Sequence, residues 1–141
     1  MEIHIDEPKE FIFTAQIPLR ISDINYGGHL SNDAVLSLTH DARMQWLHSK
    51  GWSEIDIEGL GIIMKNAAIE FTNQSFYGDR LEVKLALHDL RRFDFDIIYH
   101  IERSKDQAII AKVQTGFFCF SYEAQKIRSI PEGLKKLFPE V

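Results

Sequence analysis

A short polar loop holds the residues of this sequence that could carry out chemistry. Asp23, Asn25 and His29 fall within seven residues, with Tyr26-Gly27-Gly28 between the last two. A carboxylate, an amide and an imidazole are groups that orient water, relay protons or act as a nucleophile. The loop leads directly into a long, mostly apolar segment, and backbone N–H groups around 28–32 could polarise an acyl oxygen. We therefore expect the chemistry where the loop meets this segment.

Strand and helix signals flank the loop. From Glu10 to Ser22 apolar residues recur at every second position, which is the period of a strand with one buried face. Pro18 places this strand near a sheet edge. After the loop, Ser31-Asn32-Asp33 supplies a capping residue, and apolar residues at helical spacing predict a helix from about Asn32 to Lys50.

Four further strands are predicted after the helix: Ile62–Thr72, Leu81–Asp89, Phe93–Ile101 and Ala108–Tyr122. The short connections between them predict antiparallel hairpins. Alternation in the third of these strands predicts one buried and one largely wet face. With a short helix at 131–138, the order indicates an α+β domain covering residues 1–141, in which an antiparallel sheet cradles one helix.

Composition narrows the classes of function. The formal net charge of −5 disfavours a nucleic-acid partner, because phosphate binding depends on clustered Lys and Arg. The one cysteine, Cys119, is predicted to be a buried thiol in a reducing compartment. The sequence has neither a signal-peptide pattern nor an apolar run long enough to span a bilayer, so we expect a cytoplasmic protein with no membrane partner. The scattered histidines have no metal-ligand spacing, and no metal is expected.

Three motifs carry a resemblance to a known family. They are Asp-x-Asn-x-Gly-Gly-His-x-x-Asn in the loop, Asp41-Ala42-Arg43 in the helix, and Phe76-Tyr77-Gly78-Asp79-Arg80-Leu81-Glu82-Val83. Together the region from about Phe11 to Phe120 resembles the hotdog-fold acyl-CoA thioesterases of the 4-hydroxybenzoyl-CoA thioesterase type. The resemblance implies a long central helix wrapped by a curved antiparallel five-stranded sheet. It also implies hydrolysis of an acyl-CoA or related acyl thioester to the free acid and the thiol, without a cofactor.

The resemblance also implies an oligomer. Members of the family pair through the strand after the helix, here Ile62–Thr72, so we expect a homodimer or homotetramer. Ile62, Met64 and Asn66 would then line the acyl pocket and meet the partner subunit's loop. Within the loop, the candidates for substrate contact are Tyr26, Gly28 and Asn32. Arg91 and Arg92, in a predicted hairpin turn, could hold the CoA phosphates.

Two registers with the family assign different catalytic residues. If the paired glycines are matched, Asn25 occupies the position of the family's catalytic carboxylate and can only orient water or the carbonyl. If Asp23 is matched, the loop resembles the Asp-x-Asn-x-His arrangement of plant acyl-carrier-protein thioesterases, with two extra residues before His29. We favour the second register, with Asp23 as the carboxylate, Asn25 as the orienting amide and His29 as the general base or relay, since they are the loop's acid–base groups. Asp41 is expected to be a carboxylate that orients His29 or water, paired with Arg43 or His40 if buried.

Other interpretations of the same residues stay open. The loop is similar to the Asp-x-Asn-Pro-x-His motif of hotdog enoyl-CoA hydratases, although it has one more residue and lacks the proline. A non-catalytic hotdog protein that binds acyl thioesters is a further alternative, favoured if Asn25 replaces the catalytic carboxylate. In structural terms, Asp23 could form an Asx-turn, Asn25 could be a left-handed turn residue, and His29 could be an ordinary surface residue.

Overall fold

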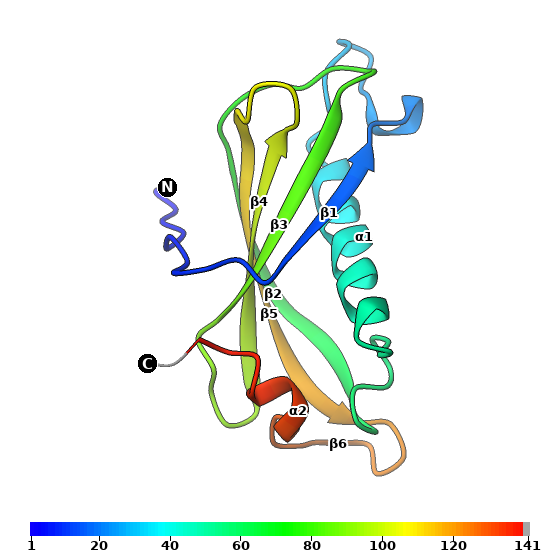
Figure 1. Ribbon diagram of the computed structural model, residues 1–141, viewed down its shortest axis with the longest axis vertical. Helices are drawn as coiled ribbons and strands as arrows, with labels where there is room; N and C mark the ends of the chain where they lie inside the picture. Colours follow the sequence, from blue (N-terminus) through cyan, green and yellow to red (C-terminus); the bar gives the residue numbers. More distant parts are fainter. Residues whose placement is uncertain (140–141) are drawn as a thin grey trace.

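One long helix lies beside an antiparallel sheet in a computed structural model, which describes residues 1–139 (Figure 1). In chain order the elements are β1 (Phe13–Pro18), the 3₁₀ turn η1 (Ile21–Asp23), α1 (Ala34–Ser49), β2 (Gly61–Phe71), β3 (Arg80–His88), β4 (Asp94–Arg103), β5 (Ile109–Ser121), β6 (Lys126–Ile127) and α2 (Glu132–Lys135). The predicted order of one strand, one helix and four strands is confirmed, with the two-residue β6 added. None of the helices within residues 1–139 has the length and apolar character needed to cross a membrane.

The strands follow the spatial order β1-β3-β4-β5-β2, and β6 pairs with the end of β5. The predicted hairpins β3–β4 and β4–β5 are confirmed. The hairpin predicted between β2 and β3 is wrong, because β2 pairs with β5 at the far edge, for example Ala67 with Thr115. The free edge of β3 is taken by β1, where Ala15 pairs with Val83. Residues 72–79 therefore run across the end of the sheet to connect β2 to β3.

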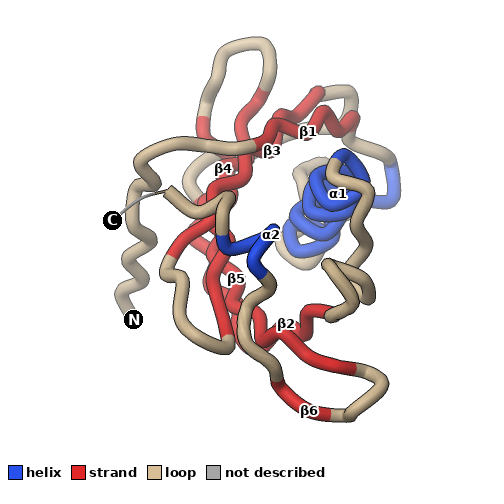
Figure 2. Tube along the Cα trace, turned by 60° about the horizontal axis from the view of Figure 1, so that its bottom comes forward, coloured by secondary structure: helices blue, strands red, loops and turns tan. Residues whose placement is uncertain are grey.

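The sheet curves around α1 and encloses its apolar face (Figure 2). The buried side chains of this face, none more than 2% exposed, are Val35, Leu38, Ala42, Trp46 and Leu47. The helix begins at Ala34, two residues later than predicted. The prediction of a side-chain cap is wrong, because no side chain within residues 1–139 forms a capping hydrogen bond at the start of this helix. Ser31 instead donates its hydroxyl to the carboxylate of Asp33. Backbone N–H groups at the start of the helix are thereby left for other partners.

A buried arginine ties the middle of α1 to the sheet. Arg43 donates from Nη1 to the hydroxyl of Tyr99 on β4, at 2.9 Å. That hydroxyl also lies 2.8 Å from Oγ1 of Thr115 on β5, and Arg43 Nε lies 3.3 Å from the carboxylate of Glu54. Burial raises the pKa of the Tyr99 hydroxyl, and Arg43 and Thr115 make smaller contributions in the opposite direction. The hydroxyl therefore stays neutral and accepts the hydrogen bond from Arg43. Because a buried charge is costly when unpaired, this network fixes the position of α1 over the sheet.

The N-terminal arm, residues 1–12, covers the sheet face opposite α1 (Figure 1). The prediction of a largely wet face on β4 is therefore wrong: Ile98 and His100, which point away from α1, are 0% and 4% exposed. The ring of His100 packs edge-on against Phe11 with centroids 5.0 Å apart, and its Nε2 lies 3.5 Å from the carboxylate of Glu7. Alternation within a strand cannot reveal a distant segment that covers its second face.

The outer edge of β2 is uncovered. Residues 63–67 are exposed along the strand, and the apolar side chains of Met64 and Phe71 are 39% and 51% exposed. At the other edge, β1 carries Pro18 at its end, which confirms the predicted edge position. An apolar, unpaired strand such as β2 is a surface on which another chain can pair.

Candidate functional site

The polar loop folds into a tight hairpin held by Asn25. Its backbone N–H donates to the carbonyl of His29 at 2.8 Å, and its own carbonyl accepts the N–H of Gly28 at 3.0 Å. The side-chain Oδ1 accepts the N–H groups of Gly27 at 2.9 Å and His29 at 3.2 Å. Gly28, with φ +86°, takes the left-handed turn conformation that glycine allows. The alternative in which Asn25 is the left-handed residue is wrong, and its amide instead braces the hairpin.

Asp23 clamps the base of this loop. Its side chain is 5% exposed, and Oδ2 accepts the backbone N–H of Arg20 at 2.9 Å. The guanidinium of Arg20 lies 3.4 Å from each carboxylate oxygen. The Asp23 carbonyl accepts the N–H of Ser31 at 2.8 Å, which closes the loop where α1 approaches. The carboxylate that the sequence proposes as catalytic thus faces Arg20, outside the pocket described below.

Most of the N–H groups expected to face a substrate are already used inside the loop. The groups of residues 28–31 donate to Asn25, Ser75 or Asp23. The N–H groups of Asn32 and Asp33 donate to no acceptor in the described part of the chain. They lie immediately before α1, where the helix dipole is positive, and a developing negative charge would be stabilised there.

The connection between β2 and β3 forms the facing wall. Leu30 donates its N–H to the carbonyl of Ser75 at 2.8 Å, and His29 and Phe76 form a β-bridge with ring centroids 5.1 Å apart. The carboxylate of Asp79 accepts the Ser75 hydroxyl at 2.7 Å and the Phe76 N–H at 2.9 Å. Although burial opposes it, these hydrogen bonds lower the pKa of Asp79, so the anchor is a carboxylate. The loop and the connection are therefore joined into one rigid unit.

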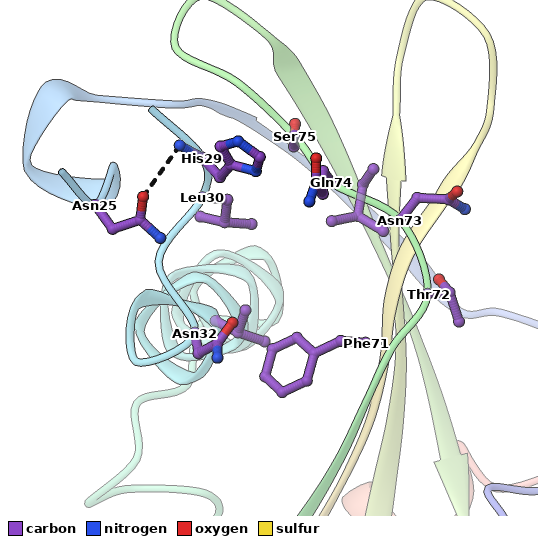
Figure 3. Close-up of a pocket in the computed structure, with 11 residues that line it drawn as sticks. Asn25, His29, Leu30, Asn32, Phe71, Thr72, Asn73, Gln74 and Ser75 are labelled. Carbon is purple, nitrogen blue, oxygen red and sulfur yellow. Dashed lines mark hydrogen bonds between the residues drawn. The ribbon is translucent and has the colours of Figure 1, made fainter. Parts of the chain in front are cut away.

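Between them, at the start of α1, lies a pocket of about 360 Å³, which we call the catalytic pocket for the role that we propose for it below (Figure 3). Its apolar lining comes from Leu30, Val35, Phe71 and Ile110, and its polar lining from Asn25, His29, Asn32, Thr72, Asn73, Gln74 and Ser75. The structure thus brings together Asn25, His29 and Asn32 from the residues proposed on sequence. None of these eleven lining residues is an acid, so the ionisable group of this pocket is His29.

His29 contributes the imidazole that lines this pocket. Its side chain is half-buried, and neither ring nitrogen is hydrogen-bonded to another described residue. Figure 3 shows Gln74 and Ser75 next to the imidazole, with Asn25 on the other side. A neutral imidazole can take a proton from a water held among these polar groups and return it to a leaving group.

The polar run Thr72-Asn73-Gln74-Ser75 is the part of the pocket that sequence reasoning missed. The side-chain amide of Asn73 donates to the carbonyl of Ile109 at 2.7 Å, which fixes the run against the start of β5. Four polar residues directly after an apolar strand are a usable signal, because functional groups concentrate on anchored loops. The sequence pattern alone does not show which other loop these four polar residues will face.

Asp41 does not have the environment expected from the sequence. The prediction that it could be buried and paired with His40 or Arg43 is wrong: Asp41 is exposed on α1 and accepts a hydrogen bond from Gln45 at 3.0 Å. Both expected partners pair with Glu54 instead, at 3.0 Å and 3.3 Å. Because His40, Asp41 and Arg43 project in different directions from one helix, they cannot all face the sheet, and Arg43 is the one that is buried.

The remaining proposed substrate contacts lie elsewhere on this chain. The first half of β2 holds Ile62, Met64 and Asn66, whereas the residue of β2 that lines the pocket is Phe71 at its end. By the rise of a strand, Ile62 and Phe71 are roughly 30 Å apart. Tyr26 projects from the loop and is fully exposed, and Gly28 forms the turn beside it.

Arg91 and Arg92 follow the end of β3, whereas the pocket residues 72–75 precede its start. The guanidinium of Arg91 pairs with Asp94 at 2.7 Å and with Asp96 at 2.8 Å. Arg92 lies over the ring of Phe93 at 5.0 Å. Arg91 is thus already committed to two carboxylates, and Arg92 is the more available cation of the pair.

Cys119 is not positioned as a nucleophile. Burial, with a smaller contribution from the charge of Asp94, raises the pKa of its thiol to about 12. The thiol is 1% exposed on β5, which confirms the predicted burial. A protonated, enclosed thiol is chemically inert.

Comparisons with known proteins agree with this geometry. Residues 19–138 match the sequence profile of the thioesterase-like superfamily. The 1,4-dihydroxy-2-naphthoyl-CoA hydrolase of Synechocystis is 25% identical over 123 residues, covering 85% of this chain and 89% of the relative. A protein of Aquifex aeolicus, named as a proposed esterase, is 32% identical over 132 residues, covering 92% of this chain and 98% of the relative.

Solved structures share the architecture. The crystal structure of a 1,4-dihydroxy-2-naphthoyl-CoA thioesterase from Synechocystis aligns with a TM-score of 0.79 at 23% identity, covering 89% of this chain and 93% of that one. The helix enclosed by a curved antiparallel sheet is the hotdog fold. With this fold, and with a family match over most of its length, the chain belongs to the thioesterase-like superfamily.

Proposed function

We propose that this chain hydrolyses an acyl-CoA, or a related acyl thioester, to the free acid and the thiol. The observation that carries the proposal is the catalytic pocket, where His29 and Asn32 border one space with an apolar wall. Thioester hydrolysis requires a polarised carbonyl, an activated water and a proton relay. Membership of the thioesterase-like superfamily supports the same reaction, and the Synechocystis relative is named for hydrolysis of an aromatic acyl-CoA.

The proposed steps use residues of the catalytic pocket. The unused N–H of Asn32 polarises the thioester oxygen at the start of α1. His29 takes a proton from a water molecule as the water oxygen bonds to the acyl carbon, and the C–S bond then breaks. The proton passes from the imidazolium to the departing thiolate. Asn25 holds the main chain of His29 by hydrogen bond, and Asp23 holds the base of the loop, so both are positioning residues.

Thiol release from aromatic and aliphatic acyl-CoAs tests the proposal. We expect turnover by the wild type and a loss of about 10²–10⁴-fold in kcat for His29→Gln, the range for removal of a general base. His48→Gln, at an exposed histidine near the end of α1 that does not line the pocket, is the matched control. Absence of thiol release from every substrate, or full activity in His29→Gln, would overturn the proposal.

We also propose that two copies pair through β2. The strand is an open edge with residues 63–67 exposed, and exposed Leu36 and Met44 extend this apolar surface along α1. His40 on the same helical stripe pairs with Glu54, whose carbonyl accepts the N–H of Ile62 at 2.8 Å, so the stripe lies near the start of β2. Pairing there would cover both surfaces.

Antiparallel pairing would also complete the catalytic pocket. It sets the first half of one β2 opposite the end of the other, where Phe71 lines the pocket. Ile62, Met64 and Asn66 of a second copy would then approach the substrate from the side that this chain leaves open. The exposed Asp41 of a second copy is the carboxylate that we propose to approach the water.

A further inference from the structure

Residues 72–75 bring four polar side chains to the wall of the catalytic pocket, and three of them are committed to the protein. The hydroxyl of Thr72 and the amide of Asn73 both donate to the first main-chain carbonyl of β5. The hydroxyl of Ser75 donates to the carboxylate of Asp79 at 2.7 Å. The side chain of Gln74 is exposed, and its amide forms no hydrogen bond with any residue from 1 to 139. Gln74 therefore brings an unused amide to the pocket.

The main chain of Gln74 is held on both sides. Its carbonyl accepts a hydrogen bond from Nη1 of Arg103 at 2.8 Å, and Nη2 of Arg103 lies 2.9 Å from the carboxylate of Asp106. The carbonyl of the next residue, Ser75, accepts the N–H of Leu30 at 2.8 Å. The protein thus fixes the point from which the amide projects while leaving the amide itself without a structural contact.

The strand pairing places Gln74 near His29. His29 forms an antiparallel bridge with Phe76, and Gln74 lies two positions before Phe76. Side chains at such diagonal positions share one face of the pair and are roughly 7–8 Å apart, within reach of long side chains. Figure 3 shows the amide of Gln74 and the imidazole of His29 bordering the same space. A water molecule between two polar groups at this spacing can form a hydrogen bond with each.

An imidazole alone fixes only one hydrogen of an attacking water. A second acceptor is needed to hold the other hydrogen, so that a lone pair of the water oxygen faces the acyl carbon. The Oδ1 atom of Asn25 cannot serve, because it already accepts the N–H groups of Gly27 and His29. The Oε1 atom of Gln74 is a free acceptor on the opposite wall.

We propose that Gln74 is a catalytic residue that holds the attacking water. This inference rests on the proposed function and adds the group that orients the nucleophile. Oε1 of Gln74 accepts one hydrogen of the water while His29 removes the other as a proton, and the water oxygen bonds to the acyl carbon. The C–S bond then breaks, and the proton on His29 passes to the thiolate. Gln74 itself neither gains nor loses a proton.

Two substitutions of equal length test this role by thiol release from an acyl-CoA. Gln74→Met removes the acceptor, and we expect a fall of about ten- to hundredfold in kcat because the water is no longer oriented. KM should stay within about twofold, and the free energy of unfolding should not change. Gln74→Glu keeps an acceptor oxygen and should stay within about tenfold of wild type in kcat. Gln16→Met, at an exposed glutamine of β1 that does not line the pocket, is the matched control.

Acyl transfer to added hydroxylamine separates placement of water from a structural role. The neutral nitrogen has a free lone pair and bonds to the acyl carbon without a base. The C–S bond breaks, and a proton from the nitrogen passes to the thiolate. Formation of the hydroxamate by Gln74→Met should therefore stay within about twofold of wild type, although hydrolysis falls.

The outcomes distinguish this inference from the proposed function. Full hydrolytic kcat in Gln74→Met, a rise in KM at unchanged kcat, or an equal loss of hydrolysis and hydroxamate formation overturns the role of Gln74 while wild-type hydrolysis leaves the function standing. Gln74→Glu as slow as Gln74→Met overturns the acceptor role of Oε1. Absence of thiol release from wild type overturns the proposed function, and this inference with it.

Discussion

In the register that matches the paired glycines, Asn25 occupies the place where the family resemblance puts a catalytic carboxylate, and its side chain holds the loop there. Its Oδ1 accepts two backbone N–H groups, one of them from His29, the proposed base. A carboxylate at this position could accept the same two hydrogen bonds. The hairpin geometry is therefore compatible with either side chain, and what differs is the charge presented to the pocket.

This geometry predicts how two substitutions of Asn25 will differ. Asn25→Asp keeps both acceptor contacts, so the fold and thioester hydrolysis should be retained. Asn25→Ala removes both, and we expect a loss of about 1–2 kcal/mol in the free energy of unfolding and a fall of roughly tenfold or more in kcat as His29 loses its fixed position. Urea denaturation and thiol-release assays measure the two effects. If Asn25→Asp is as inactive as Asn25→Ala, the side-chain NH₂ of Asn25 contacts the substrate instead.

At the scale of elements, the N-terminal arm of 12 residues packs on the sheet face opposite α1. His100 on β4 is buried beneath it, with Glu7 from the arm, Glu102 and Lys84 from the neighbouring strand positions and Lys112 from β5 around it. Burial lowers the pKa of His100 below its ordinary value of 6.5, against the opposing charge of Glu7. The folded chain therefore favours neutral His100, although Glu7 of the arm favours the charged ring.

Folding stability should depend on pH through this histidine. Because its folded pKa is lowered, the unfolded chain binds more protons below pH 6.5. The contribution is fully present above pH 6.5 and is lost as the pH falls toward the folded pKa. We expect wild type to lose more stability than His100→Gln between pH 7 and about 5.5, measured by urea denaturation, while His48→Gln follows wild type. If His100→Gln loses as much stability as wild type over this pH range, the pH dependence comes from other groups, such as Glu7 at lower pH.

The same elements explain what the sequence could and could not predict. Period-two alternation located each long strand to within a few residues, and helical spacing located α1, because burial of one face imposes those periods. The partner of β2 could not be predicted, since only the occupation of the β3 edge by β1 sends residues 72–79 across the sheet. For the site, residue types located the loop around Asn25 and His29. They could not reveal that Asp23 turns toward Arg20, because that depends on the local path of the main chain.

At the scale of the whole molecule, one connection links the catalytic pocket to the uncovered edge of β2. Residues 72–79 leave β2 at the edge where we propose that two copies pair, and residues 72–75 form a wall of the catalytic pocket. Pairing of two copies would therefore act on the same segment that lines the catalytic pocket. If two copies pair as we propose, the oligomeric state becomes a condition for activity.

The proposed dimer predicts that one substitution will reduce assembly and activity together. Ala67 lies exposed near the middle of β2, and Ala67→Lys places a charge on the pairing edge at little cost to the folded chain. For wild type, we expect sedimentation to give twice the mass of one chain, or four times that mass if dimers pair again. For Ala67→Lys, we expect the mass of one chain. Thiol release should fall in parallel because the catalytic pocket then lacks the second copy. Thr14→Lys, exposed on the opposite edge in β1, is the control and should remain associated and active. A monomeric Ala67→Lys variant with full activity would mean that the catalytic pocket of one chain is complete by itself.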